Sequence, residues 1–208
     1  MNLADLFPLV FCVNMYNRPD RWGEARQEIS KLDIIPQRLE GIIFTGSVDK
    51  NIDRYIGCGL AHMEGFKIAG ELNENVLMFE DDVEFLPGFR ENVQAAIDEL
   101  PDDWDMFYLG ANVCKKIYRV SPHIGKLTHA QATHAYGINK RFIPKLLEME
   151  PRFQREIMDL MYSGEVIPQN NCYITIPMVA IQRNGFSDIE GEYREFGWMI
   201  ERFEEQLR

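Results

Sequence analysis

Three adjacent acids, Glu80, Asp81 and Asp82, follow the short apolar run Val76–Phe79. A strand that ends in a carboxylate cluster is costly unless something offsets the mutual repulsion of the charges. A divalent cation carrying a phosphorylated ligand would do so, because Mg²⁺ and Mn²⁺ take oxygen ligands and share them between one or two protein carboxylates and substrate phosphates. The triplet therefore favours a metal–phosphate site, and a solvated strand end without a ligand is the alternative.

The composition sets limits on the class of protein and on its partners. The 208 residues are 46% hydrophobic and carry a formal net charge of −11. This indicates one folded domain with a real core, and it argues against nucleic acid as a partner, because nucleic acid needs clustered basic side chains. No segment approaches the roughly 20 apolar residues of a membrane span, and the N-terminus does not read as a signal peptide.

Cysteine usage points to a reducing compartment. No C-x-x-C pair occurs, which argues against a structural zinc site, and most of the cysteines lie in apolar or strand-like runs typical of buried free thiols. We therefore expect a cytoplasmic protein. The four cysteines are Cys12, Cys58, Cys114 and Cys172.

The first half of the chain alternates predicted strands and helices. The strands are expected at Leu9–Val13, Gly41–Thr45, Val76–Phe79 and Asp105–Leu109. Between them we expect a helix over Trp22–Leu32 capped by Asp20, a glycine-rich turn at Gly57 entering a helix, and a helix that starts near Pro87. Alternation of this kind predicts a mostly parallel sheet covered on both faces, with ligands beyond the carboxyl ends of the strands. The segments in that position are Asn14–Asp20, Glu80–Asp82 and Gly110–Asn112.

The second half is less regular. A helix is expected over Lys140–Met149, another over Phe153–Met161, and strand-like runs occur at Cys172–Ile176 and Met178–Ile181. Phe196–Leu207 has an apolar stripe and is predicted to be an amphipathic surface helix.

Five stretches, taken in order, resemble glycosyltransferase family 25, the lipooligosaccharide galactosyltransferase type that is related to collagen galactosyltransferases. In the second stretch, Ala61 stands where the "GCxxSH" pattern of the family has Ser. The stretches are Val10–Arg21, Ile56–His62, Val76–Val83, Trp104–Gly110 with Thr133–Ile138, and Pro177–Ile189.

This resemblance implies an α/β fold of the GT-A type in a single domain over 1–208, with a nucleotide-binding half at 1–112 and an acceptor-side half at 113–208. It implies an enzyme of lipopolysaccharide or other glycan biosynthesis that moves a hexose, galactose or glucose, from a UDP-sugar. The cation would be Mn²⁺ or Mg²⁺, the transfer would invert the anomeric centre, and the acceptor would be a glycan, a lipid-linked glycan or a protein.

The resemblance also assigns roles to residues. Asp82 is implied as the metal ligand, with Glu80 near the metal or ribose and Asp81 near the sugar. The nucleotide would be held by side chains of the first loop, of the segment before Gly57 and of the late signature. These nucleotide-binding candidates are Asn14, Arg18, Arg54, Tyr55 and Gln182.

An inverting transfer needs a base for the acceptor hydroxyl. Asp159 is the leading candidate by analogy with the family, and its apolar neighbours would raise its pKa through burial. Asp188 is the rival. The structural alternative for Asp159 is an exposed helix face.

Two other functions remain open. A nucleotidyltransferase also uses a carboxylate–metal site on an α/β sheet, but this N-terminus lacks the Gly-rich loop with Lys or Arg that holds a triphosphate. A sugar-nucleotide-binding module without turnover stays open because of Ala61 and the short chain. His62, on the helix after Gly57, is predicted to be a packing residue.

Overall fold

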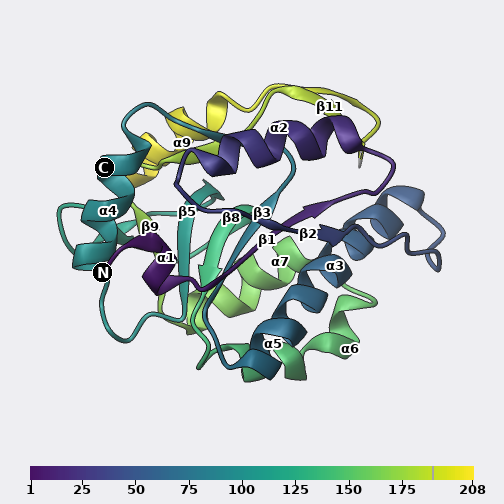
Figure 1. Cartoon of the computed structure of the whole chain (residues 1–208), viewed down its shortest axis with the longest axis horizontal. Coiled ribbons are helices and arrows are strands. Elements are labelled where there is room, and N and C mark those ends of the chain that lie inside the picture. The colour runs from purple at the N-terminus through teal and green to yellow at the C-terminus, as the bar shows by residue number, and fades with distance from the viewer. Residues whose placement is uncertain (189) are drawn as a thin grey trace.

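A computed structural model describes residues 1–188 and 190–208, and its centre is an eight-stranded sheet in the order β2-β1-β3-β8-β5-β9-β7-β6 (Figure 1). Six of its strands point the same way, because only β8 and β7 pair antiparallel with neighbours of the common direction. The α/β class and the mostly parallel sheet are therefore confirmed. The strands are β1 Leu9–Asn14, β2 Gln37–Glu40, β3 Val76–Glu80, β5 Met106–Val113, β6 Tyr118–Arg119, β7 Ile124–Lys126, β8 Ala130–Ile138 and β9 Cys172–Thr175.

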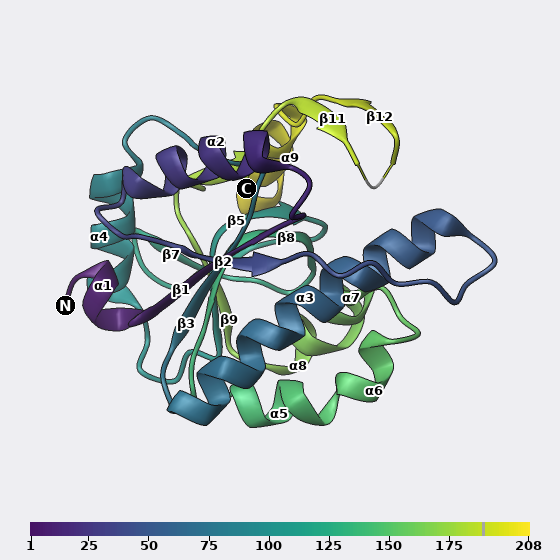
Figure 2. The same cartoon turned by 45° about the vertical axis from the view of Figure 1, so that its right-hand side comes forward.

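Helices cover both faces of this sheet, with α2 and α4 on one side and α3, α5 and α6 on the other (Figure 2). In the described part of the chain the helices are α1 Leu3–Leu6, α2 Pro19–Ser30, α3 Lys50–Leu72, α4 Phe89–Glu99, α5 Ile143–Glu148, α6 Glu150–Phe153, α7 Met158–Met161, α8 Ile167–Gln169 and α9 Trp198–Leu207, with a π-helix at Tyr162–Val166 between α7 and α8. Two small antiparallel pairs complete the fold: β4 Val83–Phe85 with β10 Ala180–Gln182, and β11 Gly185–Ser187 with β12 Glu192–Arg194.

Strand alternation divides the core into two clusters. In β3, Val76 and Met78 belong to the cluster that packs against α3, whereas Leu77 and Phe79 belong to the cluster beneath α1, α2 and α4. Successive side chains of a strand point to opposite faces, so each apolar strand residue is buried against one helical layer or the other. The amphipathic C-terminal helix is confirmed as α9, which buries Met199 and Phe203.

Two expected elements of the first half are wrong in position. Gly41–Thr45 is not a strand, because β2 ends at Glu40 where its partner β1 ends at Asn14, and no ladder continues beyond that point. Helix α3 already begins at Lys50, ahead of Gly57, with the Asp49 side chain accepting from the backbone N–H of Asn51. Gly57 therefore lies inside a helix and not in a turn that enters one.

Close packing explains this glycine better than turn formation does. A Cβ built on Gly57 would lie 2.1 Å from the carbonyl oxygen of Ile42, so only glycine lets α3 approach that segment. Gly110 is likewise inside β5 and not beyond its end; a Cβ there would lie 1.9 Å from the carbonyl oxygen of Ala180.

Smaller differences concern the other helices. Asp20 lies in the first turn of α2, and its N-cap is Arg18, because Pro19 begins the helix one residue earlier. The helix expected over Lys140–Met149 is shortened to α5, and the one expected over Phe153–Met161 is divided, with residues 154–157 outside α6 and α7.

Candidate active site

The acid triplet lies where β3 ends, and strand alternation sends its side chains to different sides. Glu80 continues the series of Val76 and Met78 and so faces α3, whereas Asp81 comes next and meets Arg21 of α2. This is the expected position for a ligand site in an open α/β sheet, beyond the carboxyl ends of β1 and β3.

A cleft of about 710 Å³ opens above these acids. Its lining brings together the loop after β1, the segment that follows β2, the acid triplet and the segment around β11. This volume lies in the range of pockets that take ligands of nucleotide size. The predicted residues in its lining are Asn14, Arg18, Arg54, Glu80, Asp81, Asp82, Gln182 and Asp188.

Asp81 is held by two partners, Arg21 of α2 and Asn14 at the end of β1. Arg21 Nη2 lies 2.5 Å from Asp81 Oδ1, and Asn14 Nδ2 donates to Asp81 Oδ2 at 2.5 Å. Burial raises the pKa of Asp81 despite the opposing charge of Arg21. Arg21 also lies 3.4 Å from Asp82 Oδ2, so its guanidinium contacts two acids of the triplet.

Glu80 has a different environment. Thr133 Oγ1 donates to Glu80 Oε1 at 2.6 Å, and His62 Nε2 lies 3.5 Å from the same oxygen. Burial works to raise the pKa of Glu80, but the contacts of His62 and Thr133 outweigh it, so the pKa lies below its usual value. Glu80 therefore ionises more readily than an ordinary glutamate, in contrast to its two neighbours.

Asp82 is the acid with an unsatisfied atom. Gln182 Nε2 donates to Asp82 Oδ2 at 3.2 Å, but the buried Oδ1 has no hydrogen-bond partner among the described residues. Burial, together with the charge of Glu80, raises the pKa of Asp82 to about 7. An orphaned buried carboxylate oxygen beside two further acids fits a hard divalent cation, which takes oxygen ligands.

Asp188 lies on the other side of the cleft mouth. Arg18 Nη1 donates to Asp188 Oδ2, and Arg21 Nη1 lies 3.5 Å from the same oxygen. These contacts tie the segment around β11 to the start of α2. Ile189, the last residue of the fifth family motif, lies outside the described residues.

Arg54 and Tyr55 are neighbours in α3 but line different cavities. Arg54 lines the cleft and donates from Nη1 to Asn51 Oδ1 at 3.3 Å. Tyr55 lines the smaller second pocket, and its hydroxyl donates to Glu190 Oε1 at 3.2 Å. The two predicted nucleotide-binding side chains therefore line adjoining cavities, and their contact with a nucleotide stays a prediction.

A second pocket of about 210 Å³ adjoins the cleft and contains Asp159. The N–H of Ala132 donates to Asp159 Oδ2 at 3.0 Å, and Thr133 Oγ1 lies 3.3 Å from Asp159 Oδ1. Burial and the charge of Glu80 raise the pKa of Asp159 to about 6. Both cavities are lined by Cys58, Glu80, Gln182, Ser187 and Phe196.

The backbone around this acid is unusual. Ala132 has φ of 67°, a left-handed conformation that costs a non-glycine residue free energy. The backbone N–H of this same residue donates to Asp159 Oδ2. Such a cost at a residue lining a pocket is typical of positions where the backbone orients a functional group.

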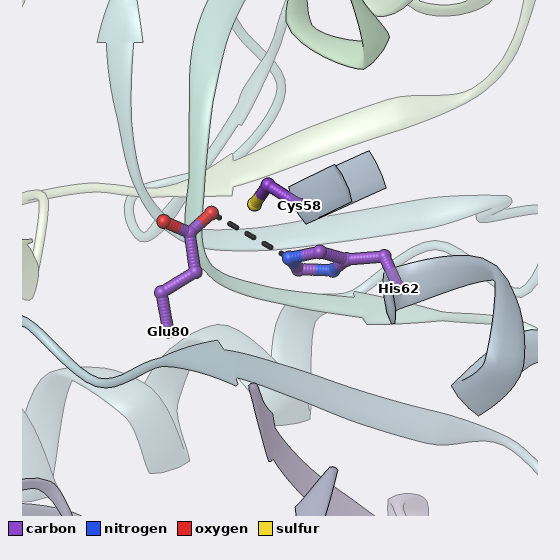
Figure 3. Close-up of side chains that lie close together, drawn as sticks. All are labelled: Cys58, His62 and Glu80. Carbon is purple, nitrogen blue, oxygen red and sulfur yellow. Dashed lines mark ion pairs between the residues drawn. The ribbon is translucent and has the colours of Figure 1, made fainter. Parts of the chain in front are cut away.

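Sequence reasoning missed several residues of the site. Thr133 bridges Glu80 and Asp159, yet nothing in its local pattern distinguishes it from any strand threonine. Arg38 of β2 donates to Asn14 Oδ1 at 2.5 Å and to the carbonyl of Met15 at 2.9 Å, which fixes the loop after β1. Cys58 and His62 face Glu80 from α3 (Figure 3), and their i, i+4 spacing was the available signal.

Comparisons with known proteins agree with the sequence motifs. The model of "Glycosyltransferase family 25 (LPS biosynthesis protein)" matches residues 53–143. A mimivirus protein described as "Procollagen lysyl hydroxylase and glycosyltransferase" is 23% identical over 232 residues, covering 86% of this chain and 25% of that protein. A Bos taurus protein described as "Probable inactive glycosyltransferase 25 family member 3" is 23% identical over 174 residues, covering 70% of this chain and 29% of the bovine one. The chain thus spans less than a third of the curated relatives it matches.

A solved structure supports the fold. A glycosyltransferase involved in the glycosylation of the major capsid of PBCV-1 superposes with a TM-score of 0.55 at 9% identity, covering 95% of this chain and 97% of that one. None of the helices in the described part of this chain combines the length and apolar character that a membrane crossing requires. The fold and the motif matches agree, and the chain resembles glycosyltransferase family 25, as its five sequence motifs indicate.

Proposed function

We propose that this protein is a metal-dependent glycosyltransferase that moves a hexose, galactose or glucose, from a UDP-sugar to a glycan, lipid-linked glycan or protein hydroxyl with inversion. One observation carries the proposal. An acid-floored cleft of about 710 Å³ adjoins a smaller pocket of about 210 Å³, and the smaller pocket holds the half-buried carboxyl of Asp159 with a raised pKa. A donor and an acceptor would thus meet at the wall that the two cavities share.

The nucleotide half of the donor belongs in the larger cavity. Asn14 and Arg18 follow β1, and Arg54 faces the same cleft from α3. Guanidinium groups pair well with phosphate oxygens, and Gln182 lies beside Asp82 at the cleft floor. Asp188 would hold the arginines of α2 in position before the donor arrives.

Asp82, with Glu80, would hold Mn²⁺ or Mg²⁺, since Asp82 Oδ1 is buried and has no hydrogen-bond partner among the described residues. When bound, such a cation stabilises the negative charge of a departing diphosphate. Asp81, which Arg21 and Asn14 anchor, would be oriented toward the donor sugar.

Asp159 would act as the general base. Its ionised form would accept the proton of the acceptor hydroxyl while that oxygen bonds to the anomeric carbon and the bond from that carbon to the diphosphate breaks. A pKa of about 6 leaves the carboxylate mostly ionised near neutral pH while keeping it more basic than an exposed aspartate. The hydrogen bond from the N–H of Ala132 and the contact with the Thr133 hydroxyl hold one orientation of the side chain.

A second candidate is a sugar-nucleotide-binding module without turnover. Arg21 lies 2.5 Å from Asp81 and 3.4 Å from Asp82, so a protein cation already neutralises part of the triplet. The bovine relative is described as a probable inactive member of the family, which keeps this candidate open. A module of this kind would bind a nucleotide sugar with little dependence on metal.

A thermal-shift panel combined with a turnover assay tests the proposal. UDP-, GDP- and CMP-sugars are added with and without Mn²⁺ to the wild-type protein and to Asp82→Asn. A ligand that binds only the folded state raises its stability by about 2.7 kcal/mol at a hundred times its Kd. We expect stabilisation by a UDP-sugar that requires Mn²⁺ and is lost in Asp82→Asn, together with release of UDP when an acceptor is present.

Glu84→Gln is the matched control, because Glu84 is an exposed acid two residues from Asp82 in β4. It should behave as wild type. Stabilisation that ignores Mn²⁺, without UDP release, would favour the binding module. A cooperative melting transition that no nucleotide sugar shifts would refute both candidates.

A further inference from the structure

The wall between the two cavities carries a group of side chains that the proposed transfer does not use as a unit. Cys58, His62 and Glu80 offer a thiol sulfur, an imidazole nitrogen and a carboxylate oxygen that all lie within 4.8 Å of one another. Figure 3 shows the three side chains converging, and Cys58 and His62 both belong to α3. We propose that they form a binding site for a borderline divalent transition ion of the Zn²⁺ type, which has Glu80 in common with the hard-cation position at Asp82 but takes its other two ligands from α3.

The fold presents these ligands from two rigid elements. Cys58 and His62 are four residues apart in α3, so they lie one turn apart on the same helix face. Glu80 ends β3 and faces that helix. A site on a long helix and a central strand holds its ligands with little freedom, and such pre-organisation favours metal binding.

His62 supplies the independent observation. Its side chain is fully buried, and Nε2 has no hydrogen-bond partner among the described residues although it points at Glu80 Oε1. A charge-assisted hydrogen bond between a protonated imidazole and a carboxylate would shorten to about 2.7–2.9 Å. The separation of 3.5 Å is instead about that of two ligands of one tetrahedral ion at bond lengths of about 2.0–2.2 Å.

The surroundings of His62 also suit a metal ligand. The hydroxyl of Tyr136 lies 2.9 Å from His62 Nδ1. When Nδ1–H donates to that hydroxyl, the lone pair of Nε2 is left free and points at the other two ligands. Metal-ligating histidines commonly make such a second hydrogen bond, which fixes the ring orientation and the tautomer.

The ligand set selects the class of ion. A thiolate and an imidazole favour Zn²⁺, Co²⁺ and related ions over Mg²⁺, which prefers oxygen alone. Three protein ligands leave a fourth tetrahedral position for water. Because Cys58 lines both cavities, an ion can enter from solvent, and bringing Sγ to bonding distance requires a closure of about 1 Å.

The inference goes beyond the proposed function and does not depend on it, because it involves no nucleotide, acceptor or turnover. It does share Glu80 with the cleft, so an ion here would draw that carboxylate away from the donor side. Occupancy would therefore couple the second pocket to the first.

Cobalt titration of the metal-stripped full chain tests the site. Binding of Co²⁺ through a thiolate produces charge-transfer absorption in the near ultraviolet that oxygen and nitrogen ligands do not. We expect this band at one Co²⁺ per chain and its loss when Zn²⁺ is added. Cys58→Ser should abolish the band, whereas Cys114→Ser should keep it, since Cys114 is a half-buried free cysteine that is not part of the group.

Two further variants separate this site from its neighbours. Tyr136→Phe keeps the ring and removes the hydroxyl beside Nδ1, so Co²⁺ affinity should fall by about 10-fold or more. Asp82→Asn should leave the band unchanged, which distinguishes this site from the hard-cation position. Each variant is first shown to melt cooperatively. No band in the wild-type chain, a band that persists in Cys58→Ser, or its loss in Asp82→Asn or Cys114→Ser would overturn the proposal.

Discussion

The acids of the two cavities have different electrostatic partners. In the cleft, Asp81 meets a guanidinium at 2.5 Å, and Asp188 is paired with arginines of the same helical unit. In the second pocket, Asp159 accepts from the backbone N–H of Ala132 and lies 3.3 Å from the hydroxyl of Thr133, and neither group carries charge. The comparison teaches that a fixed cation offsets part of the charge in the cleft, where burial still raises the pKa of Asp81 and Asp82, whereas no cation among the described residues lies beside Asp159 and its charge is relieved by protonation.

This difference suits different roles for the two cavities. A cation-rich cleft mouth can receive a diphosphate, which brings negative charge with it. Asp159 has a pKa raised by burial and can exchange a proton during a reaction. The following substitutions test this contrast between the cleft and the second pocket.

Removing the base should have the largest effect. Asp159→Asn cannot accept a proton, so turnover should fall by about 10²–10⁴-fold. Stabilisation by the UDP-sugar should persist, because Asp159 lines only the second pocket. Steady-state UDP release and thermal shift measure the two effects. Glu156→Gln, a nearby exposed acid held by Arg152, is the control and should keep full turnover. Equal loss in both variants would contradict the assignment of the base.

A larger side chain at Gly57 should displace α3, which contributes residues to both cavities. Gly57→Ala places a methyl group against the carbonyl oxygen of Ile42, 2.1 Å away, and forces α3 to shift. Overpacking of this kind costs about 1–3 kcal/mol of unfolding free energy, measured by urea denaturation. Gly23→Ala lies in α2 with no atom within 4 Å, and should instead be neutral or stabilising by up to about 1 kcal/mol. A neutral Gly57→Ala would contradict the tight approach of α3.

Removing the guanidinium of Arg21 should increase the repulsion between the carboxylates of the triplet. Arg21→Gln leaves Asp81 and Asp82 without that partner, so stability should fall by about 1.5–3 kcal/mol near neutral pH. The loss should shrink near pH 4, where these acids bind protons. Mn²⁺ should restore more stability in Arg21→Gln than in the wild type if the cleft accepts a cation. An equal response of the two proteins would favour the binding module.

The pH dependence of stability gives the smallest effect. Because the pKa of Asp159 is raised to about 6 in the folded state, that state holds a proton which the unfolded chain releases near its ordinary pKa of about 3.9. Stability of the metal-free protein is therefore greatest below that lower pKa with respect to this group, and it falls as the pH rises toward about 6.

Asp159→Asn should flatten this decline, so that its unfolding free energy relative to wild type rises by about 1–2 kcal/mol across the same pH interval. Urea denaturation at several pH values measures the difference. Glu156→Gln again serves as the control, because contact with Arg152 lowers the pKa of that carboxyl instead of raising it. A difference that does not change with pH would contradict the raised pKa of Asp159.

Local patterns in the sequence predicted much of the sheet. The apolar runs Leu9–Val13 and Val76–Phe79 are strands within a residue, because buried parallel strands are continuous apolar stretches. The acid triplet was placed correctly at a strand end for the same reason. Gly41–Thr45 has the same apolar character, yet its strand is absent, since a strand requires a neighbour and β1 has ended by then.

Sequence alone determined the acid cluster, its position after a central strand and the family resemblance, because each depends on a contiguous motif. Only the tertiary structure decided which acid meets Arg21, which meets His62 and which keeps a free oxygen. These pairings join residues tens of positions apart, and they follow from strand alternation and from how closely α3 packs. The motif supplied three carboxylates, and the fold gave each of them a different electrostatic environment.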